Sequence, residues 1–183
     1  MTRRLVILLL GVMMVLSCDS EGEPERVLGK LKPKREALVP SESKVKGSRL
    51  SGALDWNEEG IAWTRYDSGL EEARASGKPI LALVYADWCA HCKKYGENFF
   101  ESKIEDISKK YVMVLVNQDK EPATSRYLSP DGIYVPRTFI LSSEGEIRDD
   151  IFAVPSRFQF FYDYRSPENI LNAMKKGLSK PKT

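Results

Sequence analysis

Trp88-Cys89-Ala90-His91-Cys92-Lys93 is the stretch of sequence that decides the fold. It follows an apolar run over residues 80–86, which predicts a buried strand, and the residues from Cys92 onward favour a helix. A cysteine at such a junction lies near unpaired backbone N–H groups and a positive helix dipole, which favour the thiolate. Because the thiolate attacks disulfides, Cys89 and Cys92 are predicted to catalyse dithiol–disulfide exchange, with Cys92 releasing the product.

A Cys-x-x-Cys pair can also have other functions. A structural zinc site needs four ligands, and the chain has three cysteines, one of them the distant Cys18, and one histidine. A Cys-only zinc site is therefore excluded within one chain, and a mixed site would need a carboxylate. A purely structural disulfide would stabilise little, because the closed loop is very short. Cu(I) handling by soft thiolates and a non-catalytic peptide-binding module stay open as alternatives.

Composition indicates one soluble globular domain with an extension. The chain has 183 residues, of which 42% are hydrophobic and 30% charged. Its 28 basic residues nearly balance 26 acidic ones, and two of the basic residues, Arg3 and Arg4, lie in the first segment. The remaining sequence has no basic patch, so no nucleic-acid partner is expected. No resident metal and no cofactor beyond a redox-active Cys89–Cys92 disulfide are expected.

Residues 1–17 are predicted to be a signal peptide. A positive start at Arg3-Arg4 precedes an apolar run over residues 5–16, too short to span a bilayer comfortably. Val15-Leu16-Ser17-Cys18 resembles a bacterial lipobox, in which the cysteine is lipidated and becomes the new N-terminus. This predicts a lipoprotein attached to a membrane through Cys18, with an ordinary cleaved signal peptide as the alternative.

Residues 18–53 are predicted to be a flexible tether. They are rich in charged residues, Pro, Ser and Gly, and no aromatic residue occurs before Trp56. Such a segment cannot bury enough apolar surface to offset the entropy of ordering. The folded domain is therefore predicted over residues 54–183.

Periodicity and turn signals predict alternating helices and strands in this domain. The order indicates an α/β sandwich. The expected elements are a helix over 67–76, capped by Asp67 or Ser68 and ended by Gly77; the strand 80–86; a helix from Cys92 that continues through 103–110; strands at 112–116 and 138–141; a hairpin turn at 143–146; a strand at 147–152; and a helix at 167–178, capped by Ser166 with Pro167 at its first position.

This order, with Trp-Cys-x-x-Cys after the first long strand, resembles the thioredoxin fold over about residues 56–178. The resemblance implies a three-layer α/β/α sandwich with a central mixed sheet. It also implies that the Val135-Pro136 bond is cis and faces the cysteine pair, where the backbone at Val135 and Pro136 would bind a substrate strand. Protein thiols or disulfides and a redox partner protein are the partners it implies.

A closer resemblance is to the anterior-gradient group, small thioredoxin-like proteins that include thioredoxin domain-containing protein 12. It is carried by residues 75–79, Trp88-Cys89, 99–102, 111–114 and above all Ser129 to Arg137. Members generally end in an endoplasmic-reticulum retention tetrapeptide, whereas this chain ends Lys-Pro-Lys-Thr. Together with the lipobox, this favours a relative among bacterial envelope thioredoxin-like lipoproteins. The expected location is the periplasmic side of a bacterial membrane, with secretion or the endoplasmic reticulum lumen as alternatives.

Three residues are expected to tune the site. Leu83 occupies the position, six residues before the first cysteine, where thioredoxin and protein disulfide isomerase carry a buried acid that helps to move the proton of the second cysteine. His91 resembles the histidine of the Cys-x-His-Cys motif of protein disulfide isomerase, and an imidazole near Cys89 would stabilise the thiolate. Trp88 is expected to shield the sulfurs and to offer substrate a flat apolar contact, with a purely packing role as the alternative. For Arg137, contact with substrate backbone and simple solvation both stay open.

Overall fold

The computed structural model describes residues 53–154 and 157–179. The predicted signal peptide of residues 1–17, the lipidation site Cys18 and all but the last residue of the predicted tether lie outside the described residues. Within the described ranges, none of the helices has the length and apolar character needed to cross a bilayer.

Four strands form one mixed sheet. Their order is β1-β3-β2-β4, in which β1 and β2 run parallel to β3, and β4 is antiparallel to β2. The central strand β2 therefore carries hydrogen-bonded neighbours on both edges. The strands are β1 (Trp63–Thr64), β2 (Ile80–Tyr85), β3 (Val112–Asn117) and β4 (Arg137–Leu141).

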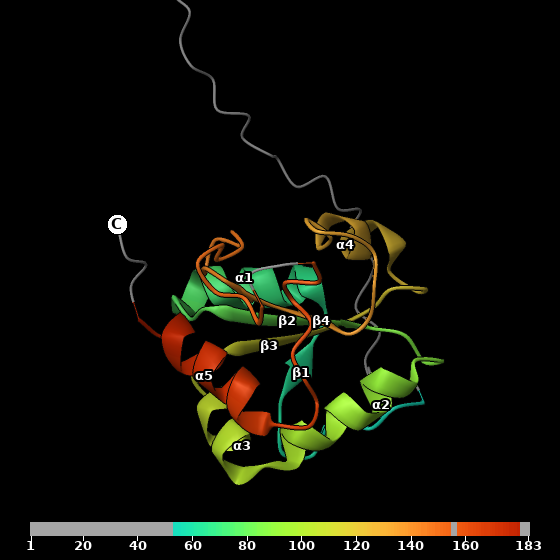
Figure 1. Ribbon diagram of the computed structural model, residues 1–183. Helices are drawn as coiled ribbons and strands as arrows, with labels where there is room; N and C mark the ends of the chain where they lie inside the picture. The colour runs from blue at the N-terminus through green and yellow to red at the C-terminus, as the bar shows by residue number, and fades with distance from the viewer. Residues whose placement is uncertain (1–52, 155–156, 180–183) are drawn as a thin grey trace, which may run out of the picture. The chain divides into compact units, whose positions relative to one another are not determined.

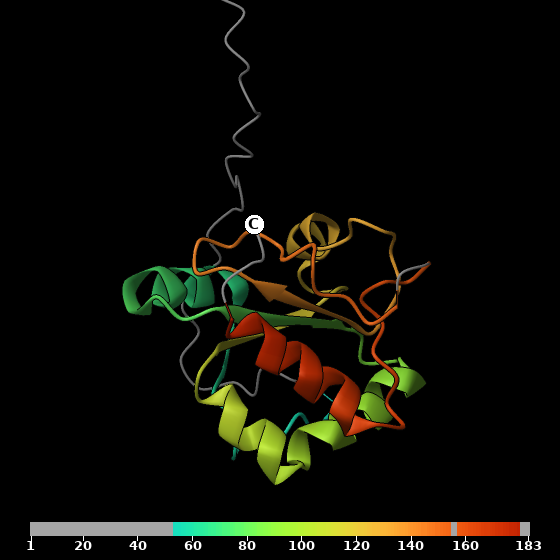
Figure 2. The same ribbon diagram turned by 60° about the vertical axis from the view of Figure 1, so that its left-hand side comes forward.

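Helices cover both faces of this sheet, which confirms the predicted three-layer α/β/α sandwich (Figure 1). One face carries α1 and α4, and the other carries α2, α3 and α5, of which α3 and α5 lie side by side in both views (Figure 2). A short 3-10 helix, η1, joins α2 to α3. The bounds are α1 (Tyr66–Ser76), α2 (Ala90–Gly96), η1 (Glu97–Phe100), α3 (Ser102–Ser108), α4 (Pro122–Tyr127) and α5 (Pro167–Gly177).

The continuous apolar runs in β2 and β3 follow from this sandwich, because a sheet buried on both faces needs apolar side chains at every position. Alternation along β2 places Leu81, Leu83 and Tyr85 in a core cluster with residues of α2, α3 and α5. The intervening residues of β2 pack in a second cluster, which includes Tyr66 and Ala73 of α1. The sheet thus separates two cores.

The helix ends differ in part from the sequence prediction. Helix α1 begins at Tyr66, with Arg65 in the N-cap position and no side-chain capping bond, so the capping roles predicted for Asp67 and Ser68 are wrong. Gly77 ends the helix as predicted, with φ 71°, a conformation that glycine adopts without steric cost. Ser166 does occupy the N-cap position of α5, but its hydroxyl donates to Glu168 instead of capping the helix.

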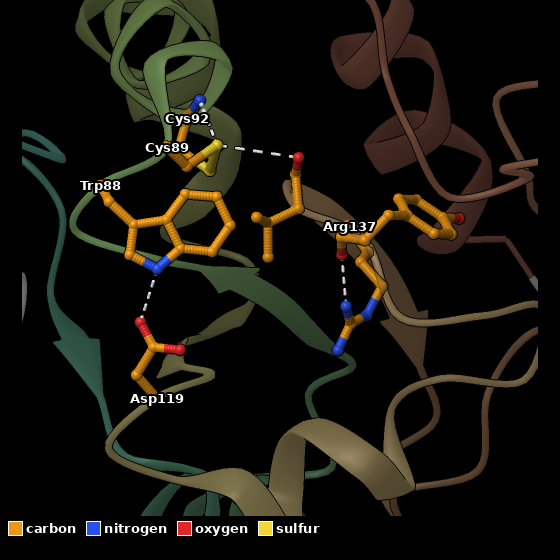
Figure 3. The surroundings of a disulfide bond; sticks show 7 residues. Trp88, Cys89, Cys92, Asp119 and Arg137 are labelled. Atoms are coloured by element: carbon orange, nitrogen blue, oxygen red, sulfur yellow. Dashed lines mark hydrogen bonds between the residues drawn. A yellow bond between two sulfur atoms is a disulfide. The ribbon is translucent and has the colours of Figure 1, made fainter.

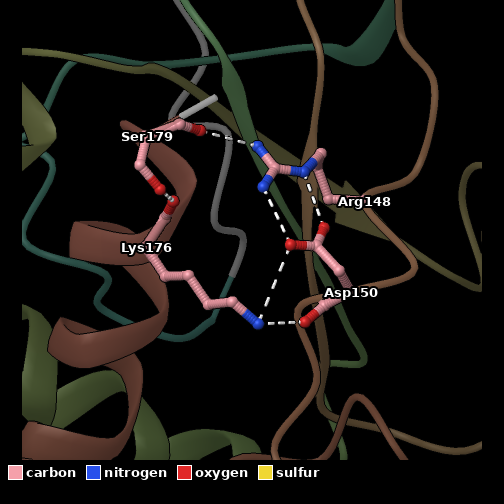
Figure 4. Close-up of polar contacts among 4 residues, drawn as sticks. All are labelled: Arg148, Asp150, Lys176 and Ser179. Atoms are coloured by element: carbon pink, nitrogen blue, oxygen red, sulfur yellow. Dashed lines mark hydrogen bonds and ion pairs between the residues drawn. The ribbon is translucent and has the colours of Figure 1, made fainter. Parts of the chain in front are cut away.

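The strand predicted at 147–152 is wrong. The turn before it forms as expected, with the Ser142 N–H donating to the Glu146 carbonyl at 2.8 Å. Pairing then stops after a single bridge between Leu141 and Ile147. The physical reason is the charged sequence Arg148-Asp149-Asp150, in which the Arg148 guanidinium turns to bind Asp150 (Figure 4).

These charges link the segment after β4 to the end of α5. The Arg148 Nε and Nη2 groups donate to the two carboxylate oxygens of Asp150 at 2.7 and 3.0 Å, and Nη1 donates to the Ser179 carbonyl at 3.1 Å. Lys176 of α5 binds the backbone carbonyl of Asp150 and lies 3.7 Å from its carboxylate (Figure 4). The hydrogen bond from Arg148 holds the pKa of the Asp150 carboxyl below its ordinary value.

We therefore predict that Asp150→Asn lowers the free energy of unfolding by about 1 kcal/mol at pH 7, because it removes a partly exposed bidentate pair. The folded-state pKa of Asp150 lies below the unfolded value of about 3.9. The greater stability of the wild type over Asp150→Asn is therefore fully present above that pH. It is lost as the pH falls through the folded-state pKa. Urea unfolding at several pH values measures this difference. Asp149→Asn, at the exposed neighbouring position, is the matched control, and an equal effect of the two substitutions would contradict the account.

Candidate active site

Cys89 and Cys92 form a disulfide at the start of α2, with their Cα atoms 5.2 Å apart (Figure 3). Cys89 is the N-cap residue of this helix, and its Sγ accepts a hydrogen bond from the Cys92 N–H at 3.0 Å. Cys89 is 6% exposed, whereas Cys92 is completely buried. An incoming thiol or disulfide can therefore reach the Cys89 sulfur more easily than the Cys92 sulfur.

Val135 lies directly beside this disulfide. Its carbonyl oxygen is 3.7 Å from the Cys89 Sγ (Figure 3). The Val135-Pro136 bond is cis, as the sequence predicted. In the described part of the chain, the Val135 N–H donates no hydrogen bond. Strand β4 starts immediately after Pro136, so Val135 presents an unused backbone donor next to the sulfurs.

Trp88 is the most exposed aromatic residue at the site, with 70% of its surface accessible. Its indole Nε1 donates to the Asp119 carboxylate at 2.8 Å (Figure 3). Asp119 is itself held by a hydrogen bond from its N–H to the Asn117 side chain at 3.1 Å. The indole is thus anchored at its polar edge, and its apolar surface faces solvent beside the cysteines.

His91 is exposed and packs against aromatic rings that follow β4 in sequence. Its ring centroid lies 6.1 Å from that of Phe161 and 5.7 Å from that of Tyr164. Among the described residues, no hydrogen bond connects its imidazole with Cys89. The imidazole therefore joins α2 to the segment before α5, a contact that the sequence did not predict.

Both roles that stayed open for Arg137, contact with substrate backbone and simple solvation, are wrong, because the residue neither contacts solvent nor is free to bind a substrate. The side chain is completely buried, and its guanidinium donates to the carbonyl oxygens of Leu128, Ser125 and Tyr134. Burial lowers the pKa of this guanidinium from its ordinary value. Because Tyr134 immediately precedes Val135, the arginine fixes the backbone that approaches the disulfide (Figure 3). The signal in the sequence was the alternation of β4, which places Arg137 on the same face as the buried Phe139.

The layer behind the disulfide is apolar apart from hydroxyl groups. Leu83 is completely buried and pairs in register with Leu115 on β3 and Thr138 on β4. The Thr138 hydroxyl forms a 3.1 Å hydrogen bond with the hydroxyl of Tyr95, one helical turn after Cys92. Burial raises the pKa of Tyr95, so this pair is neutral at physiological pH. No group of three or more His, Cys, Asp or Glu that could hold a metal ion occurs within the described ranges.

Comparisons with known proteins find similar sequences and structures. A family model described as thioredoxin-like matches residues 62–143. The human anterior gradient protein 2 homolog is 29% identical over 130 residues, covering 70% of this chain and 72% of the relative. Anterior gradient protein 1 of Xenopus laevis is 27% identical over 180 residues, covering 94% of this chain and 95% of the relative. A disulphide isomerase structure from Xylella fastidiosa Temecula1 aligns with a TM-score of 0.49 and 17% identity, covering 74% of this chain and 98% of that one.

The fold and the cysteine pair thus define a thioredoxin-like domain. The chain is similar to anterior gradient proteins, with 27–29% identity to the two relatives above.

The Arg137 contacts generate a prediction about stability. Arg137→Met leaves three backbone carbonyls without their donor, and we predict a loss of about 2–4 kcal/mol in the free energy of unfolding. Arg137→Lys should retain part of that stability, because a lysine keeps the charge but lacks the planar fork of donors. Urea unfolding measures both variants. Arg126→Met, at an exposed position on α4, is the control, and a loss for Arg137→Met no larger than this control shows would refute the anchoring role.

Proposed function

We propose that this domain is a thiol–disulfide oxidoreductase that exchanges disulfides with protein substrates. The observation that supports this most strongly is the position of Cys89. Its sulfur is the accessible one of the pair, accepts the Cys92 N–H, and lies 3.7 Å from the carbonyl oxygen of Val135. An extended substrate segment that pairs with the unused Val135 N–H would bring its own sulfur to Cys89.

The exchange follows from this geometry. In the reducing direction, the Cys89 thiolate attacks a substrate disulfide, forms a mixed disulfide and releases one substrate thiolate. The Cys92 thiol then loses its proton and attacks the Cys89 sulfur, which releases the second substrate thiolate and leaves the Cys89–Cys92 disulfide seen in the structure. A redox partner protein would return the pair to the dithiol. The oxidising direction is the reverse of these steps.

The rate of the second step depends on how Cys92 loses its proton. Cys92 is completely buried, and Leu83 and Leu115 occupy the strand positions behind the pair. The nearby hydroxyl pair of Tyr95 and Thr138 is neutral and offers no strong base. We therefore expect resolution by Cys92 to be slow compared with attack by Cys89, so that mixed disulfides accumulate during turnover.

The roles of the two cysteines can be separated by a matched pair of serine variants. Cys89→Ser should abolish the reduction of insulin disulfides, because it removes the accessible nucleophile. Cys92→Ser should also abolish turnover, but it should retain a mixed disulfide with the substrate, which non-reducing electrophoresis detects as a band of higher mass that dithiothreitol removes. The wild-type chain is the reference for both assays.

The same experiment tests the alternatives. A wild-type protein that neither reduces insulin nor forms mixed disulfides would instead be a non-catalytic peptide-binding module or a Cu(I)-handling protein. Titration of the reduced protein with Cu(I) would then distinguish these two, because only the second requires Cys89 and Cys92 as ligands. A mixed disulfide that forms through Cys92 in the Cys89→Ser variant would contradict the assigned nucleophile.

The location of the enzyme is a separate part of the proposal. The segment Val15-Leu16-Ser17-Cys18 supports lipidation of Cys18 and attachment to the periplasmic side of a bacterial membrane. Bacterial cells expressing the chain should then carry it in the membrane fraction, labelled by radioactive palmitate, and Cys18→Ala should lose the label. An unlabelled wild-type protein in the soluble fraction would refute the lipid anchor without affecting the exchange chemistry.

A further inference from the structure

A groove of about 710 Å³ lies beside the cysteine pair, in a volume range typical of ligand sites. It is bounded on one side by His91 at the start of α2, and its apolar lining comes from the segment between β4 and α5, mainly Phe158, Phe161 and Tyr164. His91 contacts two of these rings, and Phe158 contacts Tyr134 at a ring-centroid distance of 4.7 Å. Through Phe158, the groove lining thus contacts Tyr134, the residue before the proposed substrate-pairing backbone at Val135.

Polar contacts hold the segment that carries Phe158 against the loop that leads into Val135. The Tyr134 hydroxyl donates to Asp131 at 2.7 Å, and the same carboxylate oxygen accepts the Gln159 N–H at 2.7 Å. The Phe160 N–H donates to the Tyr134 hydroxyl at 3.0 Å. The segment that carries Phe158 is therefore positioned by the same loop that leads into Val135.

Phe158 has an unusual backbone conformation. Its φ of 65° lies in the left-handed region, which bulky residues rarely occupy, and its side chain is 40% exposed. Such strain persists only where the surroundings enforce it, and it occurs preferentially at binding and catalytic sites. Here it presents an aromatic ring at the groove surface instead of burying that ring in a core.

The charge at the groove is positive. The Arg157 guanidinium lies over the Phe158 ring at 4.7 Å, and the Lys94 ammonium lies over the Tyr164 ring at 5.3 Å. Within the described ranges, no carboxylate pairs with either cation. The acidic residue of the lining, Asp163, is already bound by the Arg165 guanidinium at 2.6 Å, and this pair lowers the pKa of Asp163 to about 2.

We propose that this groove binds an extended acidic segment of the protein substrate, in which an aromatic side chain stacks on Phe158 and Phe161 and neighbouring carboxylates meet Arg157 and Lys94. This inference rests on the proposed function, because it identifies the class of substrate that the Cys89 site would receive. Aromatic rings favour an aromatic side chain through edge-to-face contacts, and unpaired cations favour carboxylates. The groove would thus select substrates whose cysteine lies close to an acidic and aromatic sequence.

The test measures binding without redox chemistry. The full chain carrying Cys89→Ser and Cys92→Ser is titrated against two fluorescent peptides that contain serine in place of cysteine. Both have one tryptophan, and they differ only in flanking residues, glutamates in one and lysines in the other. At low salt, fluorescence anisotropy should give at least tenfold tighter binding of the acidic peptide. The difference should shrink as salt is added, because salt screens exposed charges.

Two further substitutions in the same background locate the site. Arg157→Glu should weaken binding of the acidic peptide about tenfold, whereas Lys103→Glu, an equal charge reversal at an exposed position on α3, should leave it unchanged. Phe158→Asn should weaken binding without lowering the melting temperature, because asparagine tolerates the left-handed conformation better than phenylalanine does. A purely structural role for Phe158 predicts a lower melting temperature instead.

Equal affinity for the two peptides, or equal effects of Arg157→Glu and Lys103→Glu, would overturn this proposal. Insulin reduction by the protein with its cysteines intact is measured in parallel. Selective peptide binding without any insulin reduction would refute the oxidoreductase function and leave the peptide-binding role of the groove unaffected. Insulin reduction without selective peptide binding would refute only the binding role proposed for the groove.

Discussion

The pairing of β2 with β4 is the constraint on which the site depends. Strand β2 lies between β3 and β4, is completely buried, and pairs Val84 with Arg137. Four residues after β2 ends, the chain reaches Cys89, and β4 begins directly after Pro136. A fixed register between these strands therefore brings Cys89 and Val135 together, although they are 46 residues apart in sequence. Burial of both faces of the sheet makes a shift of this register costly.

Arg137 extends this constraint from the sheet to the loop before it. Its guanidinium connects the start of β4 with the carbonyl oxygens of Ser125, Leu128 and Tyr134. A buried guanidinium is stable only when its donors are satisfied, and here backbone carbonyls satisfy them instead of a carboxylate. The Val135 backbone is thus positioned from both sides, by the sheet and by the arginine, which explains how a loop can present an unused N–H at a defined place beside Cys89.

Much of this arrangement was predictable from sequence, because it follows from short-range patterns. The apolar run of β2, the glycine that ends α1 and the cysteine spacing each indicate their structure locally, and the resemblance to thioredoxins placed the cis proline. For elements that depend on long-range contacts, the sequence prediction was missing or wrong. The strand β1 has only two residues, too few to show a hydrophobic periodicity, and the helix α4 is similarly short, with six residues. The strand expected at 147–152 fails because Arg148 binds Asp150, a preference that hydrophobic periodicity does not reveal. The contacts of His91 with Phe161 and Tyr164 join segments about 70 residues apart, which a single sequence does not show to be neighbours.

We infer that the site stabilises the Cys89 thiolate, and hence the dithiol form. The Cys92 N–H donates to the Cys89 sulfur at the start of α2, and Leu83 replaces the acid that would oppose a negative charge there. The reduction potential of the Cys89–Cys92 pair, measured by equilibration with glutathione buffers, tests this claim most directly. Stabilisation of the thiolate predicts a reduction potential of roughly −230 to −150 mV, more oxidising than the thioredoxin value of about −270 mV. A potential at or below about −270 mV would show that the site favours the disulfide over the dithiol, and would contradict stabilisation of the Cys89 thiolate.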